Sequence, residues 1–193
     1  FMLKEIYEQP RAIGDTLKGR LFLEEASVNL DEFGFSSDDL KKVEKIFIVA
    51  CGTSYHAALI GKYMIEELTR VPTEVDIASE FRYRKPVVKT GDLMIAITQS
   101  GETADTLAAQ KEAKKLGAKV LSICNVVGST SSREADFLFY THSGPEIGVA
   151  STKAFTAQLV ALYLFASALG EAKGMISRDY AIELLRELLV LPG

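Results

Sequence analysis

Three continuous apolar runs constrain the fold of this chain more than any other feature. Residues 45–51 read KIFIVAC, residues 93–98 read LMIAIT and residues 120–126 read VLSICNV. Apolar runs without polar alternation are typical of strands that are buried on both faces of a sheet. Residues 74–78 and 137–141 carry weaker strand patterns. The sequence therefore predicts five strands.

Segments with helical spacing separate these strands. Apolar residues recur at that spacing in residues 53–69, 102–116, 151–169 and 178–191, and Gly117 follows the second segment as its expected end. Buried strands that alternate with helices form parallel sheets, because each crossover brings the chain back across a face. We therefore expect an α/β fold of three α-β-α layers around a five-stranded parallel sheet.

The chain is expected to form a single domain over residues 1–193. Residues 1–44 are predicted to be a helical preface, either one helix or two pieces divided near Pro10. Residues 45–170 are predicted to hold the sheet core. Residues 171–193 are predicted to form a C-terminal helix that leads toward a second domain outside this chain.

Composition and charge exclude several classes of protein. The net charge of −4 provides no basic field for a nucleic acid, so no such partner is expected. The longest uninterrupted apolar stretch, residues 159–169, is shorter than the ~18 residues of a membrane span. Cys51 and Cys124 are too few for a disulfide framework or a zinc site. We interpret them as buried hydrophobes, with a reactive thiol as the alternative, and expect a reducing cytoplasm.

Three loops are candidates for ligand binding. Ligands of open parallel sheets bind beyond the carboxyl ends of the strands, where the strand order reverses. Each loop precedes a helix, so backbone N–H groups and hydroxyls should gather at one edge and form a cup for a phosphate and sugar hydroxyls. The predicted binding residues are Gly52, Thr53, Ser54, Thr98, Gln99, Ser100, Thr103, Val149, Ala150, Ser151 and Lys153. The alternative is that these hydroxyls only cap helices.

The common cofactor and hydrolase motifs do not occur in this sequence. It contains neither the G-x-x-x-x-G-K-[ST] phosphate loop nor a G-x-G-x-x-G dinucleotide turn after the first strand. It also lacks H-E-x-x-H and G-x-S-x-G. We therefore predict no metal and no organic cofactor.

Four segments in order carry a resemblance to a known family: CGTSYHA at 51–57, EVDIASEFRYR at 74–84, QSGETADTL at 99–107 and GPEIGVASTKAFTAQ at 144–158. Together they resemble the sugar isomerase (SIS) domain family. Within it, they are most similar to the first of the two SIS domains of the glutamine:fructose-6-phosphate aminotransferases. The resemblance spans residues from about 45 to about 169 and implies a flavodoxin-like order of strands.

The resemblance also implies roles for single residues. The positions of Ser54, Thr98, Gln99, Ser100 and Thr103 would surround a sugar phosphate. Those of Thr53, Val149 and Ser151 would reach the sugar hydroxyls. Thr98 stands where many family members have serine, which keeps the hydroxyl and adds a methyl group.

The resemblance implies a reaction in which fructose 6-phosphate and glutamine-derived ammonia give glucosamine 6-phosphate. The family's catalytic residues fall outside this chain, which is therefore expected to bind fructose 6-phosphate, glucosamine 6-phosphate or glucose 6-phosphate and to catalyse little alone. Expected partners are a second copy in a homodimer, and a second SIS domain and a glutaminase domain in the complete protein. Two alternatives stay open: a non-catalytic sugar-phosphate sensor and a fructosamine-phosphate deglycase.

Five further residues have interpretations of their own. His56 is expected to contact a carbonyl rather than to catalyse, and His142 is a candidate to line the site. Glu102 and Glu146 are expected to orient backbone or to contact a neighbouring subunit, because a carboxylate beside a phosphate would repel it. Lys153 could be either a counter-charge for the phosphate or a solvated lysine at a helix start.

Overall fold

Five parallel strands form the central sheet of the computed structural model, which describes residues 1–22, 27–28 and 33–193. The order is β4-β3-β5-β6-β7, so the chain moves outward from β3 to β4 and then returns to the other side of β3 as β5. The strand order therefore reverses beside β3. The five predicted strands are confirmed as β3 (Ile46–Ala50), β4 (Thr73–Ile77), β5 (Leu93–Thr98), β6 (Lys119–Cys124) and β7 (Phe137–Tyr140).

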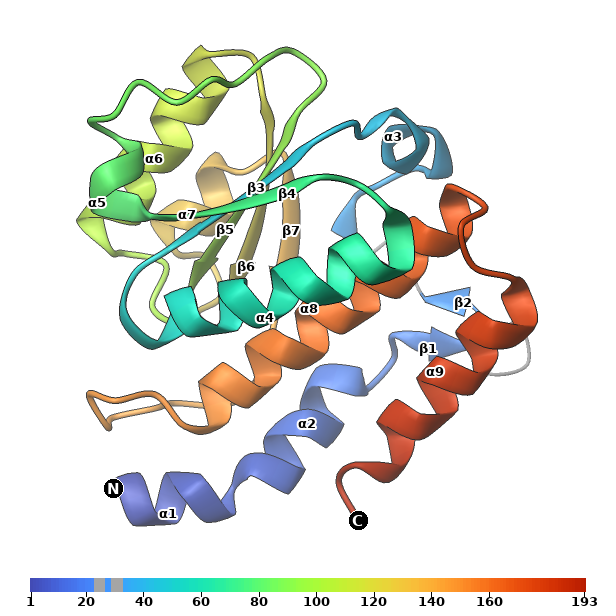
Figure 1. The fold of residues 1–193 in the computed structure, drawn as a ribbon. Helices are drawn as coiled ribbons and strands as arrows, with labels where there is room; N and C mark the ends of the chain where they lie inside the picture. Colours follow the sequence, from blue (N-terminus) through green and yellow to red (C-terminus); the bar gives the residue numbers. More distant parts are fainter. Residues whose placement is uncertain (23–26, 29–32) are drawn as a thin grey trace.

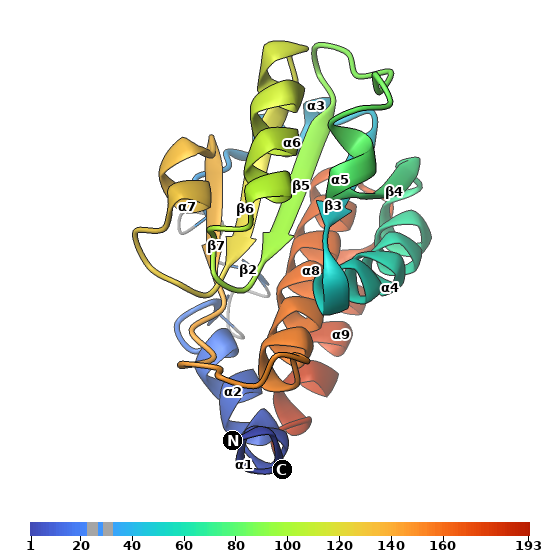
Figure 2. The ribbon, with the colours of Figure 1, turned by 90° about the vertical axis from the view of Figure 1, so that its left-hand side faces the viewer.

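Helices cover both faces of the sheet, as predicted (Figures 1 and 2). The helices α4 (Gly52–Thr69) and α8 (Lys153–Ala172) pack on one face, over Ile46 and Ile48 of β3. The opposite face carries Phe47 and Val49 and is covered by α5 (Ala78–Phe81), α6 (Ala104–Lys115) and α7 (Thr130–Glu134). Because neighbouring residues of a strand point to opposite faces, a strand covered on both faces has to be apolar throughout.

Helix α8 is the central helix of the domain. It is longer than the apolar stretch at 159–169, and by length and hydropathy its 20 residues could cross a membrane. However, 72% of its apolar window is buried inside the protein, as in the core helix of a globular domain. It packs closely against α4, where a Cβ atom on Gly61 would lie 2.7 Å from Cδ1 of Leu162.

The preface contains more than the predicted helices. α1 (Met2–Tyr7) ends just before α2 (Gln9–Leu17), so the preface begins as two pieces, with Pro10 in the first turn of the second. A two-stranded antiparallel sheet of β1 (Leu21–Phe22) and β2 (Ser27–Val28) then precedes α3 (Ser37–Lys42). Strands of two residues are too short for an alternating pattern to appear in the sequence. After α8, the helix α9 (Arg178–Val190) completes the described structure.

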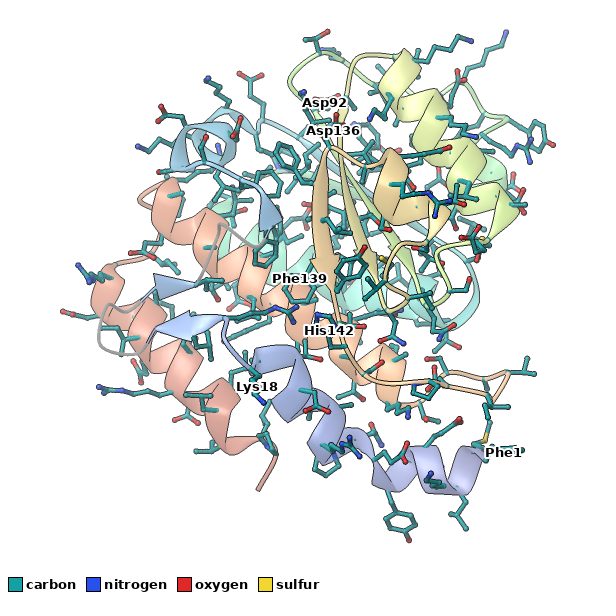
Figure 3. The ribbon with its side chains drawn as sticks, turned by 180° about the vertical axis from the view of Figure 1, so that it is seen from behind. Phe1, Lys18, Asp92, Asp136, Phe139 and His142 are labelled. Carbon is teal, nitrogen blue, oxygen red and sulfur yellow. The ribbon has the colours of Figure 1, made fainter. Side chains whose placement is uncertain are left out.

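Buried polar side chains attach the preface to the last strand of the sheet. Arg20 is 1% exposed, donates to the carbonyl oxygens of Thr16 and Tyr140, and lies over the ring of Phe139. The hydroxyl of Thr16 donates to the carbonyl of Thr141 at 2.6 Å. In Figure 3, His142 lies at the end of the sheet near the preface, whereas Asp92 and Asp136 mark the amino ends of their strands. The preface therefore adjoins the carboxyl edge.

A substitution at Gly61 tests the close packing of α4 on α8. We expect Gly61→Ala to lower the free energy of unfolding by about 1–3 kcal/mol, because the added methyl overlaps Leu162. Gly14→Ala is the matched control, since a Cβ atom at this position in α2 meets nothing within 4 Å. The control should be neutral or stabilising by up to about 1 kcal/mol in urea unfolding. Equal stability of both variants would contradict the packing argument.

Candidate functional site

The starts of α4 and α6 lie next to each other where the strand order reverses. Ala50 of β3 pairs with Ile97 of β5, so the loops that follow these two strands leave the sheet side by side. The start of α4 and the loop before α8 also lie at this end of the molecule (Figure 1). The structure thus gathers the three predicted loops at one edge.

The first turn of α4 holds Gly52, Thr53 and Ser54. Gly52 is exposed, Thr53 is half-buried and Ser54 is 8% exposed. The helix has no side-chain cap, whereas α3 and α9 are capped by Ser36 and Ser177. The hydroxyls at the start of α4 therefore do not act as its cap, and the free N–H groups of the first turn point beyond the carboxyl edge.

The loop between β5 and α6 bonds to itself through its hydroxyl oxygens. Oγ1 of Thr98 accepts the N–H of Gly101 at 3.1 Å and lies 3.4 Å from Oγ1 of Thr103. Oγ of Ser100 accepts the N–H of Glu102 at 3.1 Å. Thr103 is the N-cap residue of α6, but its side chain makes no capping bond. The first-turn N–H groups of α6 are therefore also left without a side-chain acceptor.

The start of α7 is hydrogen-bonded to this loop. The N–H of Ser131 donates to the carbonyl of Gly101 at 3.0 Å, and the N–H of Thr130 donates to Oε1 of Glu102 at 2.7 Å. The bond from Thr130 lowers the pKa of the Glu102 carboxyl. A Cβ atom on Gly101, which has a φ of +71°, would lie 2.0 Å from Oγ of Ser129. Glu102 thus orients backbone, one of its two predicted roles, and the tight contact requires glycine at 101.

Two carboxylates occupy the loop before α8. Glu146 accepts from Oγ of Ser151 at 2.7 Å, from the N–H of Thr152 at 2.8 Å and from the N–H of Ala154 at 3.3 Å. Glu5 of α1 accepts the N–H groups of residues 147 and 148 at 2.6 and 3.1 Å. The start of α8 therefore already holds an anionic group. Its N–H groups were expected to be free, but Glu146 accepts them. Glu146 orients backbone, the first of its predicted roles.

The remaining predicted residues of this loop are Val149, Ala150 and Lys153. Val149 is fully exposed and Ala150 is exposed, so they form the outer tip of the loop. Lys153 is 4% exposed, and its Nζ donates to Oε2 of Glu8 at 2.5 Å. This bond lowers the pKa of the Glu8 carboxyl. The interpretation of Lys153 as a solvated lysine is therefore wrong, and its charge is paired with Glu8.

An open cleft of about 510 Å³ separates the loops that follow β5 and β7. It is lined by Gln99, Asn125, Val126, His142, Gly144, Pro145 and Glu146. Gln99 is thus brought next to the loop before α8, and His142 lines the same cleft. Ser54, Ser100 and Thr103 lie outside this cleft. His56 is exposed, and its described contact is the ring of Tyr55 rather than a carbonyl.

Asn125 organises the cleft and does not stand out in the sequence. Its Nδ2 donates to the carbonyl of Gly144 at 2.7 Å, and its Oδ1 accepts the N–H of Ser143 at 2.8 Å. Oδ1 also accepts the hydroxyl of Thr141 at 3.1 Å. The available signal was position, because Asn125 is the polar residue that directly follows a buried strand.

Gln158, like Asn125, is a residue of this region that the sequence analysis did not identify. This α8 side chain is 1% exposed, and its Nε2 donates to Oγ of Ser54 at 2.9 Å. Its Oε1 is buried without a hydrogen-bond partner among the described residues. Such an unpaired group costs about 1–3 kcal/mol. The signal in the sequence is one amide inside an otherwise apolar helix.

The cysteines match the interpretation as buried hydrophobes more closely than that as reactive thiols. Cys124 is buried and Cys51 is half-buried, and both are free. Burial raises the pKa of the Cys124 thiol, which disfavours the nucleophilic thiolate. Within residues 1–22, 27–28 and 33–193, no group of three His, Cys, Asp or Glu side chains is arranged to hold a metal ion.

Comparison with known proteins gives consistent matches. The SIS domain model matches residues 39–168. The chain is 57% identical over 192 residues to the glutamine–fructose-6-phosphate aminotransferase [isomerizing] of Caldanaerobacter subterraneus and 55% identical over 192 residues to that of Clostridium tetani. Each match covers 100% of this chain and 31% of the relative. The chain thus spans about a third of the length of these curated relatives.

Solved structures agree with this result. The C-terminal domain of glucosamine-fructose-6-phosphate aminotransferase from Francisella tularensis superposes with a TM-score of 0.93 and 45% identity. That match covers 99% of this chain and 54% of the other. A putative phosphosugar isomerase from Clostridium difficile has a TM-score of 0.83 at 19% identity, over 99% of this chain and 52% of the other, and shares the fold.

A substitution at Glu146 tests whether this carboxylate holds the start of α8. We expect Glu146→Gln to lower the free energy of unfolding by about 1–3 kcal/mol, because one acceptor oxygen and the negative charge at the helix start are lost. Glu112→Gln is the control, since among the described residues the Glu112 carboxylate pairs with Lys115 of the same helix, at 3.8 Å. The control should change stability by less than about 0.5 kcal/mol in urea unfolding. A Glu146→Gln variant as stable as the control would remove this role.

Proposed function

The chain belongs to the SIS domain family, and from this membership we propose that it is a sugar-phosphate-binding domain of an isomerising glutamine–fructose-6-phosphate aminotransferase. The observation that carries the proposal is the pair of uncapped helix starts, α4 and α6, at the point where the strand order reverses. Their first-turn N–H groups have no side-chain acceptor and lie beyond the same edge of the sheet, which supports binding of an anion there. A phosphate dianion supplies acceptors for all of them.

The proposed binding residues divide between phosphate and sugar. Hydroxyls of Ser54, Ser100 and Thr103, with Thr98 and Gln99, would surround the phosphate, and Gly52 would let it approach the start of α4. Thr53, Val149, Ala150 and Ser151 would face the sugar. Oγ of Ser100 accepts a backbone N–H, which leaves its proton available for the ligand. Lys153, already paired with Glu8, would use another N–H of its ammonium group toward the ligand.

The reaction needs more than this chain. The printed names of the relatives describe transfer of an amino group to fructose 6-phosphate with isomerisation, and the chain covers 31% of their length. We propose that this domain holds fructose 6-phosphate while catalytic residues outside the chain add ammonia and move the proton. Fixing the substrate in this way lowers the entropic part of the barrier. The proposal includes no metal, no organic cofactor and a cytoplasmic location.

An apolar groove provides a surface for the partner domain or copy. A cavity of about 370 Å³ opens between α2, α4, α8 and α9 and is lined mainly by apolar side chains: Ile13, Met64, Leu159, Val160, Tyr163, Leu184, Leu188, Val190 and Leu191. Apolar grooves of this kind are typical of interaction sites. We propose that residues 1–44 form the preface, 45–170 the SIS core and 171–193 the connection toward a second SIS domain, and that the chain forms a homodimer.

Light scattering tests the homodimer. We expect the mass of the 193-residue chain to rise toward twice 21.1 kDa as its concentration increases. Val190→Arg should shift this transition to higher concentration, because Val190 is 67% exposed and the substitution places a charge at the surface of the apolar groove. A strict monomer at high concentration would contradict the homodimer and leave the ligand proposal intact.

Calorimetric titration with fructose 6-phosphate tests the binding function. We expect the wild-type chain to bind and Ser100→Ala to lose about tenfold or more in affinity, because a hydrogen bond to a charged group is removed. Glucosamine 6-phosphate and glucose 6-phosphate serve as further arms to rank the ligands.

Ser36→Ala is the control for that titration. It removes the cap of α3, which precedes β3 at the amino edge of the sheet, and costs about 1 kcal/mol of stability. Its affinity for the ligand should equal that of the wild type. A wild-type chain that binds none of the three hexose phosphates would sink the proposed function, and equal binding by Ser100→Ala would remove the loop from the site.

A further inference from the structure

Ser54 and Gln158 form a buried polar contact between two helices that start at the same edge of the sheet. Ser54 lies in the first turn of α4, and Gln158 lies near the start of α8. They are 8% and 1% exposed, and 2.9 Å separates Oγ of Ser54 from Nε2 of Gln158. Toward the middle of both helices, the same interface closes over Gly61 and Leu162.

We propose that Gln158 is a positioning residue that sets the direction of the Ser54 hydroxyl bond, so that Ser54 donates its proton to the bound phosphate. The inference rests on the proposed function, since it concerns how that phosphate is held. Gln158 itself does not touch the ligand and acts through Ser54.

The direction follows from the chemistry of the two groups. An amide nitrogen donates and does not accept, so Oγ of Ser54 is the acceptor in this contact. The hydroxyl proton of Ser54 is then left over, and no protein acceptor takes it among the residues that the structure describes. A phosphate dianion has only acceptor oxygens, so it requires a hydroxyl whose proton is free. The amide of Gln158 therefore converts Ser54 into a donor for an anion.

The opposite orientation of the amide is the less favourable one. With Oε1 facing Ser54, the serine hydroxyl would donate its proton to Gln158. Both N–H groups of the amide would then be buried without acceptors. In the structure one N–H of Nε2 bonds to Ser54, and the second N–H and Oε1 have no partner among the described residues, so the reverse orientation would leave one more N–H unpaired. Buried N–H groups without partners are rarer in proteins than buried carbonyl groups without partners. The surrounding apolar helix thus favours the direction that suits an anionic ligand.

A purely structural link between the helices would behave differently. A bond of either direction would join α4 to α8 equally well, so only the ligand distinguishes the two directions. Gln158→Met keeps the length of the side chain without a hydrogen bond. Gln158→Glu provides oxygen acceptors, so Ser54 has to donate to residue 158 and can no longer donate to the ligand.

The experiment is a double-mutant cycle read by calorimetric titration with fructose 6-phosphate on the 193-residue chain. Ser54→Ala should raise Kd about tenfold, the size expected for a bond to a charged group. Gln158→Met should raise Kd by about threefold to tenfold, because the Ser54 hydroxyl is no longer held. Gln158→Glu should weaken binding at least as much as Ser54→Ala. The double variant Ser54→Ala with Gln158→Met should bind no more weakly than Ser54→Ala alone.

Urea unfolding of each variant distinguishes a loss of binding from a loss of folding. Where Gln158→Glu fails to fold, the cycle with Gln158→Met gives the answer. Ser167→Ala is the control for polar loss inside α8, because within the described part of the chain this hydroxyl bonds to the carbonyl of Tyr163 at 2.9 Å, and the Kd of the variant should match the wild type.

Two results separate the inference from the function on which it rests. Gln158→Met with wild-type affinity, or with the same loss in the Ser54→Ala background as in the wild type, would overturn the role of Gln158 and leave the binding function standing. A wild-type chain that binds no hexose phosphate would overturn the proposed function and the inference with it.

Discussion

The N–H groups at the start of each helix need acceptors, and the parallel sheet brings the starts of α4, α6 and α8 to one edge. The acceptors available to these N–H groups differ between the three helices. At α8, Glu146 folds back and accepts from Thr152 and Ala154, so the helix start holds an anion from its own chain. At α4 and α6, no side chain caps the helix. Of these three starts, that of α8 is satisfied within the chain, whereas those of α4 and α6, which flank the reversal of strand order, have no side-chain cap.

The preface takes part in this arrangement rather than lying beside it. Glu5 accepts the N–H groups of the loop before α8, and Glu8 pairs with the buried Lys153 at the start of the same helix. Arg20 reaches the carbonyl of Tyr140 at the end of β7. All three contacts join the preface to the carboxyl edge of the sheet. Residues far outside the sheet core therefore determine the shape of the loop that would face the sugar.

The sequence predicted the sheet and the gathering of the three loops at one edge because both depend on local patterns. A strand that is covered on both faces has to be apolar at every position, as in β3 and β5. The position of a loop after a parallel strand follows from topology alone. The roles of Glu5, Glu146 and Gln158 depend instead on contacts across the fold, and Glu5 lies 143 positions from Gly148 in sequence. No local pattern contains such a pairing. The antiparallel pair β1 and β2 was not predicted for a different reason. Each strand has two residues, which is too short for a strand pattern to appear in the sequence.

Neutral donors and a buried lysine explain how a chain with a net charge of −4 can be suited to a dianion. A cluster of lysines would attract phosphates over a Debye length and hold any of them loosely. Here Lys153 is neutralised by Glu8, and the available groups are hydroxyls and N–H groups, which act only at hydrogen-bond distance and in fixed directions. Affinity then depends on the direction of each hydroxyl proton more than on net charge. Under that constraint, an amide that decides whether Ser54 donates or accepts influences the ligand as strongly as a residue that touches it.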